Sequence, residues 1–355
     1  MYVGMLTRTD SAGTTMSSGP GSFQFMNQYV KALKTPEVVG LCSNFGFSNT
    51  YVNGNKIKLN TKFTNSDFWK VTDFDFLEGK PYNDQQINNR DYVAVITDGL
   101  RDQYFEDGDH GVVGKYIEVE SINYRVIGVV RGSPATRLYT YSDIYFPYTL
   151  PKSNYEDKGV NGSYVAMILG KKKADLKAIQ SEFDHMITQL PPSLWNDGGR
   201  FSVLKVNAET FFDHAIQSFG SRKTTQLYTI FGLVLVMIIG LPTVNLVNVN
   251  VSRILERASE IGVRKSFGAP ARALLWQFVI ENVFITLIGG VLALVLSLII
   301  IEMINSSGWI AYADLAINPT VFLISVGVCF LFGLLSGVIP AYRMSKLKIV
   351  EALKS

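Results

Sequence analysis

Residues 252–271 read S-R-I-L-E-R-A-S-E-I-G-V-R-K-S-F-G-A-P-A, a short charged stretch between two long apolar ones. Residues 227–251 before it and residues 283–301 after it contain no charged side chain. An α-helix rises 1.5 Å per residue, so runs of this length can cross about 30 Å of hydrocarbon. The charged stretch is therefore predicted to be a loop held between two membrane-spanning helices.

Three spans are predicted, at residues 227–251, about 278–304 and 321–339. Basic side chains gather in or beside the first loop: Arg253, Arg257, Arg264, Lys265 and Arg272. More follow the third span: Arg343, Lys346, Lys348 and Lys354. The connection at 305–318 has no Lys or Arg and carries Trp309 and Tyr312 as interfacial aromatics. Because basic loops stay in the cytoplasm, the 252–276 loop and the C-terminal tail are predicted to be cytoplasmic.

The same reasoning places residues 1–222 outside the cytoplasm and leaves residues 223–355 as the membrane domain. Residues 1–13 contain no apolar stretch of the kind that exports a domain. We therefore expect a further span before residue 1 in the complete protein, absent here through truncation or a misplaced start.

The outer domain is predicted to be α+β with two subdomains, because strand and helix signals are mixed along it. Residues 10–22 are rich in Ser, Thr and Gly and predict a loop. Helices are expected at 23–34 and 173–190, the second ending at a Pro-Pro pair. Strands are expected at 92–96, 116–119, 124–130 and 201–206, with a hairpin turn at 121–123.

Composition excludes several classes of function. A net charge of +3 gives no reason to expect nucleic acid as a partner. The two cysteines, Cys42 and Cys329, lie in different halves, so no disulfide is expected between them. His110, His185 and His214 are isolated, and no metal-ligand spacing is present.

No catalytic constellation emerges either. The G-V-V-G-K at 111–115 lacks the spacing and the Ser or Thr of a P-loop. The acid–His neighbours at 184–185 and 213–214 are adjacent in sequence only, which makes surface residues the better interpretation. The acidic run at 106–109 is better explained as a solvated turn than as a cation site.

Polar residues and glycines within the spans have two interpretations. Asn245, Asn248 and Asn250 would sit at helix–helix contacts, or would line a substrate or ion path. Two glycine pairs, Gly289 with Gly290 and Gly333 with Gly337, would permit close helix packing.

The chain resembles the MacB/FtsX-type permeases, the type VII ATP-binding cassette (ABC) membrane proteins, in both halves. In the outer domain the resemblance rests on F-T-N-S-D-F-W-K-V-T-D-F-D-F-L-E-G-K-P-Y (63–82), D-Y-V-A-V-I-T (91–97), G-V-V-G-K-Y-I (111–117) and Y-R-V-I-G-V-V (124–130). In the membrane half it rests on R-A-S-E-I-G-V-R-K-S-F-G-A (257–269), Q-F-V-I-E-N (277–282) and G-V-I-P-A-Y-R-M-S-K-L-K-I-V-E-A-L (337–353).

The resemblance implies a permease subunit without catalysis of its own, whose ATP is bound by a separate cytoplasmic ATPase. It implies a homodimer or heterodimer of permease chains in the lipid of a bacterial inner membrane. The spans would pass the ATPase cycle to the outer domains, a mode called mechanotransmission. Possible further partners are a periplasmic adaptor and an outer-membrane channel. Adjacent genes for an ATPase, an adaptor and such a channel would favour efflux.

The first loop is expected to form a coupling helix on the ATPase. The residues expected at that contact are Glu260, Ile261, Gly262, Val263, Arg264, Lys265, Phe267 and Gly268. Glu260 and Arg264 form an i,i+4 pair that stabilises an exposed helix. Ile261, Val263 and Phe267 give an apolar face for a partner groove, and Gly268 is a helix stop.

Three alternatives remain open. The first is lipoprotein release, as in the Lol-type relatives. The second is activation of a cell-wall hydrolase in the manner of FtsX, for which this outer domain is large. The third is a membrane-anchored sensor with no ATPase.

Overall fold

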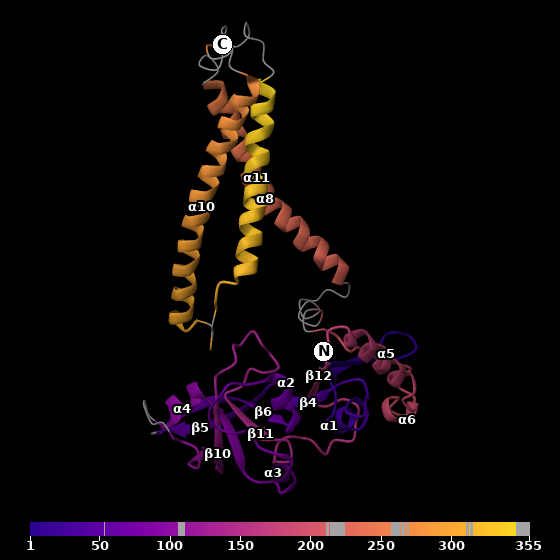
Figure 1. Ribbon diagram of the computed structural model, residues 1–355. Helices are drawn as coiled ribbons and strands as arrows, with labels where there is room; N and C mark the ends of the chain where they lie inside the picture. The colour runs from indigo at the N-terminus through magenta and orange to yellow at the C-terminus, as the bar shows by residue number, and fades with distance from the viewer. Residues whose placement is uncertain are drawn as a thin grey trace. The chain divides into compact units, whose positions relative to one another are not determined.

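The computed structural model describes residues 1–52, 54–105, 111–210, 213, 224–256, 263, 267, 270–309, 312 and 315–345. The chain divides into two compact units, Met1–Gly220 and Ser221–Ser355. The first is α+β, as the mixed strand and helix signals predicted, and the second consists of long helices (Figure 1).

A ten-stranded mixed sheet dominates the N-terminal unit. Its main path runs β1-β12-β4-β6-β11-β8-β10-β7, with β5 paired to β6 and β9 paired to β10. The β8–β10 and β6–β11 pairs are parallel and the other pairs are antiparallel. The strands are β1 (Tyr2–Val3), β4 (Val38–Ser43), β5 (Gly46–Val52), β6 (Asn55–Thr64), β7 (Phe76–Gly79), β8 (Val93–Thr97), β9 (Tyr116–Val119), β10 (Ile122–Val130), β11 (Ile144–Pro147) and β12 (Tyr164–Leu169).

A second sheet has three strands in the order β13-β2-β3. These are β2 (Met5–Thr9), β3 (Met16–Pro20) and β13 (Val203–Val206). The prediction of a loop over 10–22 was therefore wrong for β3. Its residues M-S-S-G-P are poor strand formers, but pairing with all of β2 overrides that local preference.

The large sheet has a core on each face. Alternate residues of β8 enter different clusters: Val93 and Val95 join one, Ala94 and Ile96 another. β12 behaves in the same way, with Val165 and Met167 on one face and Tyr164, Ala166 and Ile168 on the other. A strand that is buried on both faces has a nearly continuous run of apolar residues, and β8 and β12 both have such a run.

Short helices cover the faces and edges of the sheets. They are α1 (Phe23–Phe25), the π-helix η1 (Met26–Val30), α2 (Asp67–Thr72), α3 (Asp84–Asn88), α4 (Asp98–Phe105), α5 (Asp175–Thr188) and α6 (Pro192–Trp195). In Figure 1, α5 and α6 lie on the opposite side of this unit from α4 and β5. The α5 helix buries Ile179 and Phe183, which lie four residues apart on one face of the predicted 173–190 helix.

The predicted helix over 23–34 ends early, at Val30. The Glu182 carboxylate of α5 accepts the backbone N–H groups of Lys34 and Thr35, at 2.8 and 3.0 Å. Because these two N–H groups donate to α5, they are not available for helical hydrogen bonds, and the helix ends before Pro36.

The predicted hairpin joins β9 to β10, one residue earlier than expected. Its turn residues Glu120 and Ser121 have φ of 49° and 65°, the left-handed values of a two-residue hairpin turn. Gly79, in the quoted 63–82 motif, has φ of 66°, and a Cβ there would overlap the carbonyl oxygen of Ile127. Only glycine fits that close approach of β7 to β10.

The helical unit contains α8 (Thr224–Glu256), α10 (Ala271–Ser307) and α11 (Pro319–Ser345). α11 packs against both of the others. Among the described residues, two helical stretches are long and apolar enough to cross a membrane, Tyr228–Val249 with 22 residues and Val279–Ser307 with 29. The apolar stretch Pro319–Leu334 of α11 is shorter, so the third predicted span stays a prediction.

Side-chain hydrogen bonds fix the connection between α10 and α11. The Asn305 side chain donates to the Leu315 carbonyl at 2.9 Å and accepts its N–H at 3.0 Å. Asn318 caps α11 by accepting the N–H groups of Thr320 and Val321. Where α11 packs on α10, a Cβ added to Gly333 would lie 2.8 Å from Thr286 Oγ1. This glycine therefore allows close helix packing, as predicted.

Candidate functional site

Two of the eight predicted ATPase-contact residues, Val263 and Phe267, lie within the described part of the chain. The Phe267 N–H donates to the Val263 carbonyl at 3.2 Å, the i,i+4 bond of one α-helical turn. Their side chains are 48% and 87% exposed. Residues four apart share a helix face, so this turn presents an apolar pair to its surroundings.

The other six lie outside the described residues: Glu260, Ile261, Gly262, Arg264, Lys265 and Gly268. Their placement in a coupling helix therefore stays a prediction. The acidic run at 106–109, His110, His214 and the tail basic residues Lys346, Lys348 and Lys354 also lie outside.

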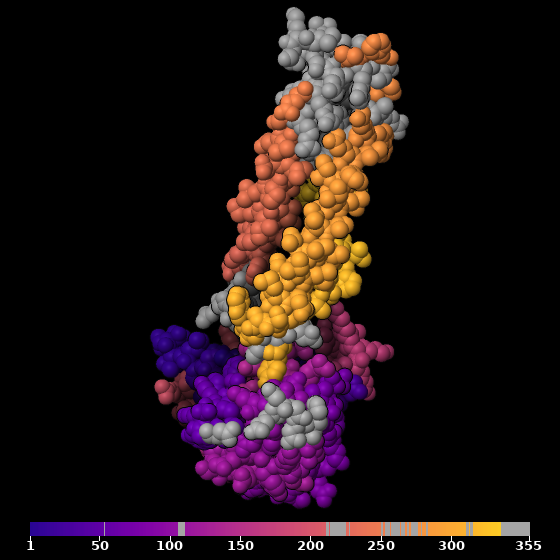
Figure 2. Space-filling model, turned by 90° about the vertical axis from the view of Figure 1, so that its left-hand side faces the viewer, coloured from indigo at the N-terminus to yellow at the C-terminus, as the bar shows by residue number. Residues whose placement is uncertain are grey.

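The long helices expose apolar side chains along most of their length. Figure 2 shows the described part of α10 in orange as a ridge along the helical unit. Phe284, Val291 and Met303 on this helix are each more than 60% exposed. A face of this size and composition is stable in lipid or against further apolar helices, not in water.

The polar residues predicted within the first span are exposed where their side chains are described. Asn245 and Asn248 lie on the surface of α8, beyond Pro242. The Thr243 hydroxyl beside that proline donates to the Ile239 carbonyl at 2.7 Å. Among the described residues nothing lies within 4 Å of a Cβ added to Gly289 or Gly290 of α10, unlike Gly333.

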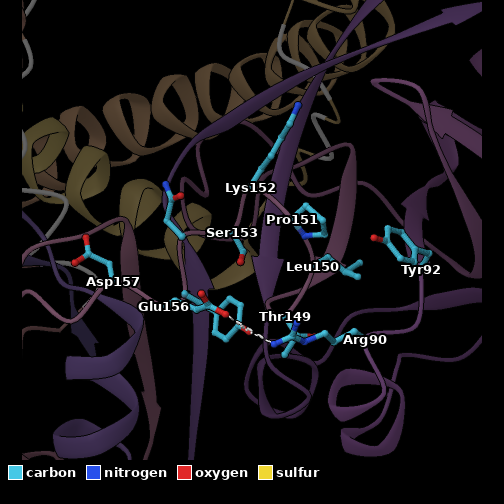
Figure 3. Close-up of a pocket in the computed structure, with 11 residues that line it drawn as sticks. Arg90, Tyr92, Thr149, Leu150, Pro151, Lys152, Ser153, Glu156 and Asp157 are labelled. Carbon is cyan, nitrogen blue, oxygen red and sulfur yellow. Dashed lines mark hydrogen bonds and ion pairs between the residues drawn. The ribbon is translucent and has the colours of Figure 1, made fainter.

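The N-terminal unit contains a hollow of about 470 Å³ beside the loop after β11 (Figure 3). The Arg90 guanidinium donates to the Tyr155 hydroxyl at 2.7 Å, and that hydroxyl donates to Glu156 at 2.8 Å. Burial and this bond to Glu156 raise the pKa of Tyr155. Lys152 forms an ion pair with Glu120. Both cations at the hollow therefore already have partners.

The backbone around this hollow is unusual. Arg90, Lys152 and Asn154 have φ of 56°, 70° and 53°, a region that side chains other than glycine rarely adopt. Two hydrogen bonds to backbone carbonyls hold the loop in place. The Tyr164 hydroxyl donates to the Ser153 carbonyl at 2.8 Å, and Gln24 Nε2 donates to the Tyr155 carbonyl at 3.3 Å. The result is a charge-balanced recess whose loop is held by these hydrogen bonds. It presents no nucleophile with an adjacent base, and the described residues contain no metal-ligand cluster.

Sequence reasoning did not find this recess. Its one visible signal is the turn-rich run P-K-S-N-Y-E-D at 151–157. The left-handed conformations that shape it cannot be read from residue types.

The G-V-V-G-K stretch has a structural role. The N–H groups of Gly111 and Val112 both donate to Glu78 Oε2, each at 3.1 Å. A carboxylate thus occupies the amides that a phosphate would need, which agrees with the exclusion of a P-loop.

Two family models match the chain. Residues 4–186 match the MacB-like periplasmic core domain, and residues 230–349 match the FtsX-like permease C-terminal domain.

Curated relatives match across both halves. The macrolide export ATP-binding/permease protein MacB of Escherichia coli K12 is 28% identical over 297 residues, 81% of this chain and 42% of the relative. The protein of that name from Salmonella typhi is 30% identical over 301 residues, 84% of this chain and 43% of the relative. The chain thus spans less than half the length of these relatives.

Solved structures match part of the chain at low identity. The extracellular domain of the transporter YknZ from Gram-positive bacteria is 15% identical, with a TM-score of 0.40, and the match covers 59% of this chain and all of that domain. A domain of a permease protein from Porphyromonas gingivalis is 13% identical, with a TM-score of 0.44, covering 60% of this chain and 94% of that one.

Proposed function

Because the chain belongs to the family of ABC permeases with a MacB-like periplasmic core domain, we propose that it is the permease subunit of an exporter. A separate cytoplasmic ATPase would bind and hydrolyse ATP. The long helices would carry its conformational cycle to the N-terminal domain outside the membrane. The observation that carries this proposal is the charged, helix-forming stretch confined between two helices fit to span a bilayer.

The proposal includes a third span, α11, and a bacterial inner membrane. It places the first loop and the tail in the cytoplasm, because both are basic. A second permease chain would cover part of the exposed apolar surface. The amides of Asn245 and Asn248 are suited to that contact, since amides in lipid seek partners. The two sheets of the N-terminal unit would correspond to its two subdomains.

The coupling contact would be made by the first loop, through the turn that contains Val263 and Phe267. Its exposed apolar pair would enter a groove of the ATPase, and the basic residues around it would meet acidic side chains at the rim. ATP-driven closure of two ATPase subunits would then push on the ends of α8 and α10.

Reversing two charges tests this contact. Arg264→Glu with Lys265→Glu should abolish co-purification of the partner ATPase, or substrate stimulation of ATP hydrolysis, because both rim attractions become repulsions. The matched control is Lys346→Glu with Lys348→Glu, which changes the net charge equally in the tail and should leave co-purification intact. Unchanged coupling and co-purification in the first variant would remove this loop from the contact.

Export is the proposed direction, and the alternatives differ in what the outer domain touches. A photocrosslinker in that domain that captures a lipoprotein would favour lipoprotein release. Capture of a cell-wall hydrolase would favour an activator. A sensor would be favoured if no ATPase co-purified with the chain and the outer domain showed no nucleotide-dependent change.

A further inference from the structure

The β5–β6 hairpin has an outer face of unusual composition. Residues 44–66 contain three lysines and no Asp or Glu. Along β5, Phe47 and Tyr51 point outward and are 58% and 60% exposed, and Phe45 just before the strand is 49% exposed. An antiparallel strand usually turns polar residues to water, so a row of exposed rings calls for a covering partner.

Lysines form a second row beside these rings. Tyr51 pairs with Lys56 across the hairpin, and Asn49 pairs with Lys58. Both lysines are exposed, and Lys58 Nζ lies 4.0 Å from the centre of the Phe47 ring. Within the described part of the chain neither has an ion-pair partner. We call Phe45, Phe47, Tyr51, Lys56 and Lys58 the hairpin face.

The opposite face of the hairpin packs against the core of the N-terminal unit. Leu59 is buried in a core cluster, and Ile57 packs against that cluster. The edge of β5 that is not paired with β6 lies beside β9 and the turn after it. There the Glu120 N–H donates to the Asn49 carbonyl, and the Thr50 hydroxyl donates to the Glu118 carbonyl. These contacts obstruct strand addition at the middle of this edge, which leaves the hairpin face as the surface open to a partner.

We propose that the hairpin face binds an acidic amphipathic helix of a partner protein outside the membrane. The two rows lie about 4.8 Å apart, and side chains repeat about every 6.8 Å along each row. A helix repeats a face position every four residues, about 6 Å, which is close to the strand repeat of about 6.8 Å, so a helix with carboxylates beside apolar side chains can follow the two rows over a short length. The exposed Glu118 of β9 lowers the charge of this region without cancelling two lysines.

A lipid surface fits less well. A segment that lies in the membrane interface inserts apolar side chains, and the described tip residues Gly54 and Asn55 offer none. The aromatic rings lie along the strand, where a protein helix reaches them. The inference rests on the proposed function only for the location of this domain outside the membrane.

The test uses the full chain in phosphatidylcholine nanodiscs, without ATPase or nucleotide. The probe is a labelled helical peptide with Glu and Leu in adjacent rows, compared with its Gln/Leu counterpart. We expect the Glu/Leu peptide to bind at least about tenfold more tightly, with the advantage shrinking as salt rises. Lys56→Glu with Lys58→Glu should remove that advantage, and Phe47→Ser with Tyr51→Ser should weaken both peptides.

Matched controls alter exposed residues elsewhere on the same unit. Lys173→Glu with Lys177→Glu and, separately, Met16→Ser should leave both affinities unchanged. Circular dichroism checks that each variant is folded, which is expected because every altered side chain is exposed.

Equal affinity for the Glu and Gln peptides, or Glu/Leu binding that survives charge reversal at Lys56 and Lys58, would overturn the proposal. So would a face that ignores the peptide and instead binds soluble short-chain phosphatidylglycerol in a lysine-dependent way, since that assigns it to lipid headgroups. None of these outcomes depends on coupling to an ATPase, so failure here is distinguishable from failure of the proposed function.

Discussion

Lys62 is a buried cation without a carboxylate in the part of the chain that the structure describes. Its side chain is 1% exposed, its Nζ donates to the Ser43 carbonyl at 3.2 Å, and it lies 5.3 Å from the Phe45 ring centre. Burial lowers the pKa of Lys62, against a smaller opposing effect of Cys42. Burial likewise raises the pKa of the Cys42 thiol to about 11. The two groups therefore titrate with opposite consequences for stability.

Replacing Lys62 by methionine should stabilise the protein at pH 7 by about 1 to 3 kcal/mol, because a buried charge is exchanged for an apolar side chain of similar length. Below the lowered pKa the native state holds the buried charge at full cost. As pH rises from that pKa toward the unfolded value of 10.5, the native state loses its proton first and the cost falls. The advantage of Lys62→Met should therefore shrink as pH rises.

Thermal unfolding of the full chain in detergent at pH 7 and at pH 9.5 measures this difference. Lys58→Met is the matched control, since Lys58 is exposed on the same strand and should give no change at either pH. A Lys62→Met variant that melts below the wild type at pH 7 would mean that the Ser43 and Phe45 contacts outweigh the cost of burying the charge.

At the scale of elements, the α10–α11 pair depends on one small residue. Gly333→Val should destabilise the helical unit by about 1 to 3 kcal/mol, because its side chain would press on Thr286. Gly327→Val, on the same helix but at a position with no neighbour within 4 Å among the described residues, should have little effect on the thermal midpoint in detergent. Thr286→Ala combined with Gly333→Val should restore part of the loss. Equal effects at Gly327 and Gly333 would show that helix propensity, not packing, sets the cost.

How much could be predicted from the sequence differs between the two kinds of element. Uncharged runs predicted the positions of the long helices, because lipid-compatible composition is itself the signal, but each helix extends two to seven residues beyond the predicted span at either end. Several strands were not predicted. β6 does alternate, with Ile57 and Leu59 inward against Lys56 and Lys58 outward, so its signal was readable. β12 is a short apolar run that periodicity alone cannot assign. The recess depends on left-handed residues such as Lys152, and no pattern of residue types predicts those.

At the scale of the whole molecule, the family models and the charge pattern both place the N-terminal domain outside the cytoplasm. The family models cover a periplasmic core domain and a permease domain, and the basic loop lies between two helices able to span a bilayer. The proposed mechanism requires the N-terminal domain and the 305–318 connection on one side of the membrane and the coupling turn on the other. That arrangement can be measured with single cysteines at exposed positions.

Three positions report the two sides: Met16, Phe267 and Trp309, which are 56%, 87% and 87% exposed. In a full-length background with Cys42→Ala and Cys329→Ala, Met16→Cys and Trp309→Cys should react with a membrane-impermeant maleimide in intact spheroplasts. Phe267→Cys should react only after lysis if the proposed topology holds, because loops rich in basic residues stay in the cytoplasm. Reaction of all three in detergent is the control for thiol accessibility. Labelling of Phe267→Cys from outside would invert the topology and would remove the turn from any contact with a cytoplasmic ATPase.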